Sequence, residues 1–72
     1  PPESRTMFDG SARRYQTDAN FRQLVDRFLD EFENELVQAD RQEPSGSLSH
    51  QMIVSDTGRV YLVLAHASTR IQ

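Results

Sequence analysis

The sequence lacks cysteine, lysine and tryptophan, and among its 72 residues it has only three glycines and three prolines. Without cysteine it has no disulfide and no zinc site built on thiolates. A chain of this length buries only about 60% of the surface that its unfolded form exposes, so its stability is marginal without disulfides or a structural metal. We therefore expect oligomerisation or a partner chain to supply the missing burial.

Long apolar runs and a basic surplus are also absent. The longest apolar run, residues 60–65, is far shorter than the ~18 residues of a membrane span, and no signal-peptide pattern is present. The net charge is −3, and the eight basic residues, all arginine, are scattered. We expect a cytoplasmic protein with no membrane role. Nucleic-acid binding is disfavoured, although Arg13-Arg14-Tyr15 keeps it open as an alternative.

The N-terminal residues 1–16 show no sustained hydrophobic period and are rich in Pro, Gly, Ser and Arg. This composition predicts a flexible N-terminal arm, followed by a single small domain over residues 17–72. The chain begins with Pro-Pro rather than Met. We therefore expect a processed chain, a tag remnant, or a piece of a longer protein, and a fragment of a larger enzyme is one alternative.

Residues 18–40 carry apolar side chains at spacings of three and four, which predicts a long amphipathic helix. Asp18 is a suitable N-cap for this helix, and Pro44 predicts that it ends near residues 40–42. The apolar positions are Phe21, Leu24, Val25, Phe28, Leu29, Phe32, Leu36 and Ala39.

Residues 48–65 read as two strands joined by the turn signal Asp56-Thr57-Gly58. In the first strand one face carries Leu48, His50, Met52 and Val54, and the other carries Ser49, Gln51, Ile53 and Ser55. The second strand is apolar on both faces. The predicted fold class is therefore α+β, with a flexible arm, one helix and an antiparallel β-hairpin. One helix covers only one face of such a hairpin, so we expect a homodimer to complete it.

The second face of the predicted hairpin carries Ile53, Tyr61 and Val63, which we expect to form the dimer or partner interface. Three aromatic residues of the helix serve as further anchors for the core or the interface: Phe21, Phe28 and Phe32. The sequence therefore predicts a small accessory, adaptor or regulatory module that acts by protein–protein contact.

An acidic surface is predicted on the helix, where Asp26, Asp30 and Glu33 lie on the side away from the phenylalanines. It would steer a basic protein partner. The alternative is a ligand-binding or divalent-metal-binding domain that uses these carboxylates with His50 and His66.

Motifs for chemistry are absent from the sequence. It has no nucleophile elbow and no glycine-rich phosphate loop. We expect no catalytic residues, no bound metal and no cofactor.

Overall fold

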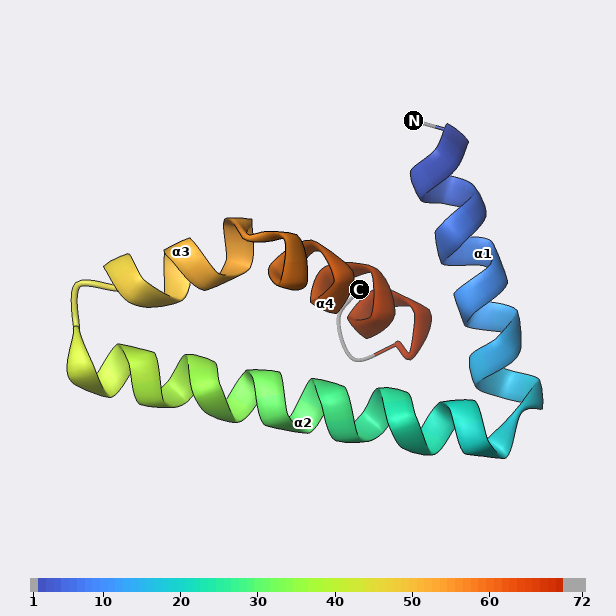
Figure 1. Ribbon diagram of the computed structural model, residues 1–72, viewed down its shortest axis with the longest axis horizontal. Coiled ribbons are helices and arrows are strands. Elements are labelled where there is room, and N and C mark those ends of the chain that lie inside the picture. The colour runs from blue at the N-terminus through green and yellow to red at the C-terminus, as the bar shows by residue number, and fades with distance from the viewer. Residues whose placement is uncertain (1, 70–72) are drawn as a thin grey trace.

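The computed structural model describes residues 2–69, with side chains described from residue 9, and every regular element within that range is a helix. The helices are α1 (Pro2–Thr17), α2 (Ala19–Gln42), α3 (Ser47–Val54) and α4 (Asp56–Ala67). Figure 1 shows α2 as a long base, with α3 and α4 returning along it and α1 rising from its N-terminal end. The predicted α+β class is therefore wrong for the described part of the chain, which is all-helical.

The long helix is confirmed as α2. A side-chain oxygen of Asp18 accepts a hydrogen bond from the backbone N–H of Phe21 at 3.1 Å, as an N-cap should. The helix ends at Gln42, two residues before Pro44, and the N–H of Glu43 closes its last turn. Gly46, with a φ of +84°, then turns the chain back into α3.

The predicted hairpin is wrong because its turn sequence starts a helix. Ser55 has extended backbone angles, and its hydroxyl oxygen accepts a hydrogen bond from the N–H of Gly58 at 3.1 Å. The same hydroxyl donates to the carbonyl oxygen of Met52 at 2.6 Å and so ties the end of α3 to the start of α4. Asp56 lies in the first turn of α4, where a negative charge stabilises a helix. Ser55-Asp56 is therefore a helix start and not a hairpin turn.

The apolar run in α4 is consistent with a helix, because a short continuous apolar run does not distinguish a strand from a buried helical segment. In α4 the buried residues Gly58, Tyr61 and Ala65 follow one another at spacings of three and four, and the buried C-cap residue Ser68 continues this spacing. Gly58 and Ala65 are small, which lets α4 approach its neighbours closely. Packing therefore overrides the β-propensity of the valines in this segment.

The core lies between α2 and α4. Leu29 is fully buried, and Val25, Phe32, Tyr61 and Ala65 surround it. The rings of Phe32 and Tyr61 are stacked, with centroids 4.6 Å apart. Burying side chains of this size stabilises a fold by about 1.5–3 kcal/mol each. This short list of buried residues is the main source of stability in the described part of the chain.

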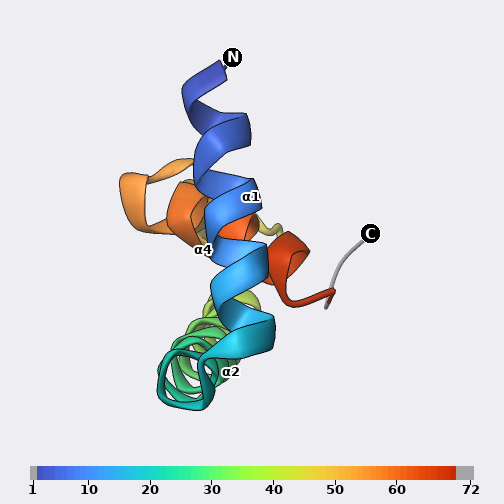
Figure 2. The ribbon, with the colours of Figure 1, turned by 90° about the vertical axis from the view of Figure 1, so that its right-hand side faces the viewer.

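The predicted flexible arm is also corrected, because residues 2–17 form α1. Its residues Ser11, Ala12 and Tyr15 are half-buried, and α1 contacts both α4 and α2. Figure 2 shows α1 crossing the end of α4. A helix without a strong hydrophobic period is therefore held by its neighbours. Residue 1 of the predicted arm and residues 70–72 of the predicted domain lie outside the described residues.

The molecule is elongated. Its radius of gyration is 13.1 Å and its extents are 38 × 27 × 19 Å, whereas a compact chain of this length has a radius of gyration of about 11 Å. The N-terminal part of α1 projects beyond the other helices (Figure 1). Within the described residues, no helix is long and apolar enough to span a membrane.

Gly58 provides a test of the contact between α3 and α4. A Cβ at this position would collide with the backbone carbonyl oxygens of Met52 and Ile53. Overpacking of this kind costs about 1–3 kcal/mol. We expect Gly58→Ala to lower the free energy of unfolding by an amount in that range, measured by urea denaturation.

Gly10 is the matched control, because it is an exposed helical glycine with nothing within 4 Å of a Cβ built on it. Gly10→Ala should raise the free energy of unfolding by roughly 0.5–1 kcal/mol. Equal stability of the two variants would contradict the close contact at Gly58.

Candidate functional site

The corner between α1 and α2 is made by Asp18, which has a φ of −119° and a ψ of 103°. The backbone N–H and the backbone carbonyl of Asp18 both make helical hydrogen bonds. The N–H of Asp18 donates to the carbonyl of Arg14 at 2.9 Å, and its own carbonyl accepts from the N–H of Arg22 at 3.0 Å. One extended residue therefore produces the whole change of direction.

Arg22 caps the end of α1. Its Nε donates to the carbonyl oxygen of Tyr15, and its Nη2 donates to the carbonyl oxygen of Gln16, each at 3.0 Å. A cation suits this place, because the C-terminus of a helix carries partial negative charge. The guanidinium also lies 5.8 Å from the centre of the Tyr15 ring. Arg22 thus links α2 to the last turn of α1.

Arg14 strengthens the corner from the side of α1. Its Nε lies 3.5 Å from Oδ2 of Asp18, and its guanidinium lies over the Phe21 ring at 4.6 Å from the centroid. The hydrogen bond from the backbone of Phe21 lowers the pKa of Asp18 below its ordinary value of 3.8. Desolvation raises this pKa, and Arg14 lowers it further. The corner therefore favours the charged form of Asp18.

Two of the three carboxylates of the predicted acidic surface accept hydrogen bonds from tyrosines of neighbouring helices. The hydroxyl of Tyr15 donates to Asp26 at 2.6 Å, and the hydroxyl of Tyr61 donates to Glu33 at 2.9 Å. These half-buried carboxylates hold α1 and α4 against α2, whereas Asp30 is exposed. The sequence alone predicts one docking face for all three carboxylates and does not predict the tyrosine partners. Tyrosines on the neighbouring segments were the only signal available.

The three residues of the predicted sheet face lie on two helices. Ile53 is half-buried on α3 and packs against the core, and Tyr61 is 7% exposed within it. Val63 is half-buried on α4. Without a hairpin, these residues do not share a sheet face.

The three phenylalanines of α2 have different environments. Phe32 is buried in the core, whereas Phe21 and Phe28 are half-buried. Leu24 lies between these two at helical spacing and is 63% exposed. We call Phe21, Leu24 and Phe28 the Leu24 patch. The apolar spacing of the helix predicts Leu24 on its apolar stripe, whereas in the structure this side chain faces solvent.

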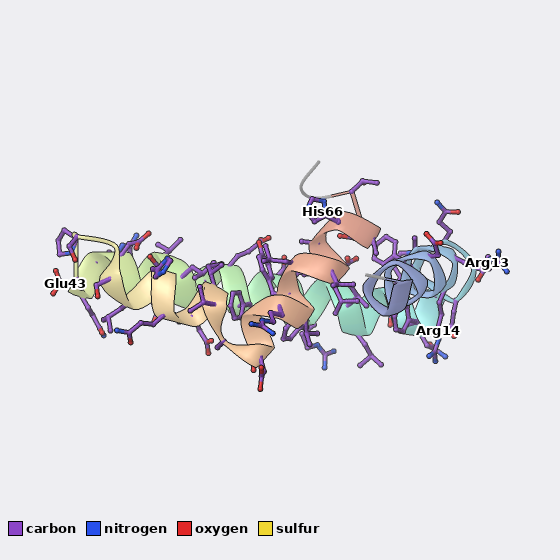
Figure 3. All side chains as sticks on the ribbon, turned by 90° about the horizontal axis from the view of Figure 1, so that it is seen from above. Arg13, Arg14, Glu43 and His66 are labelled. Carbon is purple, nitrogen blue, oxygen red and sulfur yellow. The ribbon has the colours of Figure 1, made fainter. Side chains whose placement is uncertain are left out.

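The two histidines lie on different helices, His50 on α3 and His66 on α4, and both are exposed. Figure 3 shows His66 apart from Arg13 and Arg14, which project from α1 at one end of the molecule, while Glu43 lies at the opposite end. Within the described residues, no group of three or more His, Asp or Glu side chains is placed to hold a metal ion. The alternative of a metal site on the carboxylates and histidines therefore has no geometric support there.

Comparison with known proteins gives no relative. No protein-family model matches the chain, and no curated protein or solved structure matches it either. Function is therefore inferred from the exposed face of α2 and from the corner between α1 and α2.

Asp18 makes the corner sensitive to acid. Because its pKa in the folded chain is lowered from 3.8, its charge stabilises the fold at higher pH, and this contribution is lost as the pH falls through the lowered pKa. Asparagine also caps helices well, so Asp18→Asn removes the charge and keeps a capping group.

We expect the wild type to melt at a higher temperature than Asp18→Asn at pH 6. The difference should shrink as the pH falls below 3.8. Thermal melts followed by circular dichroism at a series of pH values measure this difference. A difference that does not change with pH would contradict the role of the charge.

Proposed function

We propose that the chain is a small non-catalytic protein–protein interaction module that works as a homodimer. The observation that carries this proposal is the Leu24 patch, in which a leucine 63% exposed to solvent lies between two half-buried phenylalanines. Apolar side chains grouped on a surface mark interaction sites, and aromatic anchors supply much of the binding energy there. The cytoplasm is the proposed location.

A second copy of the chain is the partner proposed for the Leu24 patch. Arg27 and Glu31 border the patch, are both exposed and carry opposite charges. In a two-fold interface the same surface faces itself. An antiparallel crossing of two α2 helices can therefore place Arg27 of each copy beside Glu31 of the other. Exposed ion pairs of this kind add only about 0.2–1 kcal/mol each, so they fix orientation more than affinity.

A basic protein is the second proposed partner, because the C-terminal half of α2 is strongly acidic. Residues 28–40 contain no basic residue and carry five carboxylates: Asp30, Glu31, Glu33, Glu35 and Asp40. Clustered charge of one sign speeds the encounter with an oppositely charged partner and depends on salt. This surface would therefore steer association, while the Leu24 patch supplies apolar contact.

The dimer is tested by Leu24→Glu. A charge at the centre of an apolar interface remains unpaired there, so we expect the dimer to dissociate to a chain of 8.3 kDa. Light scattering over a range of concentrations measures the mass. The helical circular dichroism should not change, because this side chain already faces solvent in the single chain.

Val37→Glu is the matched control. Val37 is 48% exposed on α2 but lies outside the Leu24 patch, so this variant should dimerise as the wild type does. A wild-type chain that stays monomeric at high concentration would contradict the proposal. Equal dissociation of the two variants would contradict the placement of the interface.

A further inference from the structure

The corner between α1 and α2 interrupts a segment that is otherwise suited to one continuous helix. Residues 11–42 contain no glycine and no proline. Only Asp18 leaves the helical conformation, and helical hydrogen bonds lie on both sides of it. The bend is therefore not imposed by a helix-breaking residue, and its cause lies in side-chain contacts.

Side chains replace the backbone bonds that the bend removes. In a continuous helix the carbonyls of Tyr15 and Gln16 would accept from N–H groups four residues later. Here the guanidinium of Arg22 donates to both carbonyls. The N–H of Phe21 likewise bonds the Asp18 side chain instead of a carbonyl of α1. Three of the six backbone groups that lose a helical partner at the bend thus regain one, which reduces the difference in hydrogen bonding between the bent and straight forms.

The half-buried face of α1 and the core face of α2 are also in phase across the corner. One row of positions follows alternating spacings of four and three, and only Arg22 in it is exposed: Ser11, Tyr15, Asp18, Arg22, Val25 and Leu29. Such positions lie along one side of a continuous helix. If Asp18 became helical, α1 and α2 would form one straight helix, with the half-buried face of α1 and the core face of α2 along the same side. The face of α1 would then lie past the end of its own core and could contact the α4 of another molecule.

We propose that Asp18 is a hinge and that α1 is exchanged between two copies of the chain. In the exchanged dimer, residues 2–42 form one helix in each copy, and α1 of one copy packs on α2 and α4 of the other. The contacts are those already made within one chain, including the bond from the hydroxyl of Tyr15 to Asp26. A second copy is the partner that fits, because it presents the surface on which α1 packs.

This exchange goes beyond the Leu24 patch, because it uses the inward face of α1 instead. A helix over residues 2–42 would be about 60 Å long at about 1.5 Å per residue. The single chain is 38 Å in its longest extent. The two forms therefore differ clearly in shape.

Two substitutions at the hinge should act in opposite directions. Ala19 is the first residue of α2, a position that accepts proline, and Asp18 before it already has the extended backbone that precedes proline. In a straight helix the same proline would clash with the carbonyl of Tyr15. Ala19→Pro should therefore lock the bent form. Asp18→Ala removes the cap and favours the straight form.

The exchange is measured by energy transfer between two populations of chains, each labelled at one introduced cysteine. The chain has no cysteine of its own, so a donor on Arg13→Cys in α1 and an acceptor on His66→Cys in α4 are specific. Both positions are exposed. All chains also carry Leu24→Glu, so that a dimer through the Leu24 patch does not contribute.

Transfer between chains should appear at lower concentration with Asp18→Ala than without it, and only at higher concentration with Ala19→Pro. We expect the apparent dissociation constants of these two variants to differ by at least about tenfold. Arg22→Ala, which frees the carbonyls at the end of α1, is the second opening variant if Asp18→Ala does not fold.

The proposal is overturned if folded opening variants show no transfer between chains at any concentration, or if Ala19→Pro shows as much as Asp18→Ala. Neither result bears on the interface proposed at the Leu24 patch. Failure of that interface would instead appear as an unchanged mass on Leu24→Glu substitution in the Ala19→Pro background, where exchange is disfavoured.

Discussion

The contact between Tyr61 and α2 holds the described helices together. The Tyr61 ring stacks on Phe32 with centroids 4.6 Å apart, and its hydroxyl donates to Glu33 at 2.9 Å. One side chain thus provides both apolar burial and a hydrogen bond to a carboxylate. This contact fixes the distance and the rotation of α4 relative to α2. The position of α3 follows, because Ser55 ties its last turn to α4.

The same arrangement occurs two turns nearer the N-terminus of α2, where Tyr15 of α1 donates to Asp26. Both carboxylates belong to α2 and lie seven residues apart, two turns along one side of the helix. The long helix therefore serves as a support to which α1 and α4 are each attached by a tyrosine. The Leu24 patch of α2 is not part of either attachment.

Parts of the fold could be predicted from the sequence. The spacing of the apolar residues in α2, the cap at Asp18 and the stop before Pro44 depend on local geometry, and the structure confirms them. The segment after Gly46 could not be assigned in this way. Its alternation and its Asp-Thr-Gly are typical of a hairpin, but Ser55 and Asp56 are equally suitable as the start of a helix. Contacts with α2 determine which of these two forms.

The candidate site was predicted less well, for a related reason. Asp26 and Glu33 share a helix surface with Asp30, but which carboxylates bond tyrosines depends on where α1 and α4 lie. Likewise, Phe21, Phe28 and Phe32 share one stripe, and only the packing of α4 separates the buried Phe32 from the exposed edge near Leu24. Sequence spacing assigns residues to a side of α2, and tertiary packing decides how deeply each is buried.

The most direct test of this structure is a nuclear magnetic resonance measurement on residues 47–67. The structure predicts helical carbon chemical shifts for this segment, with a break at Ser55, and nuclear Overhauser contacts between the rings of Phe32 and Tyr61. Strand-like shifts with cross-strand contacts between residues 54 and 60 would contradict it. Such a result would mean that the segment forms a hairpin, and the packing of α4 on α2 would have to be abandoned.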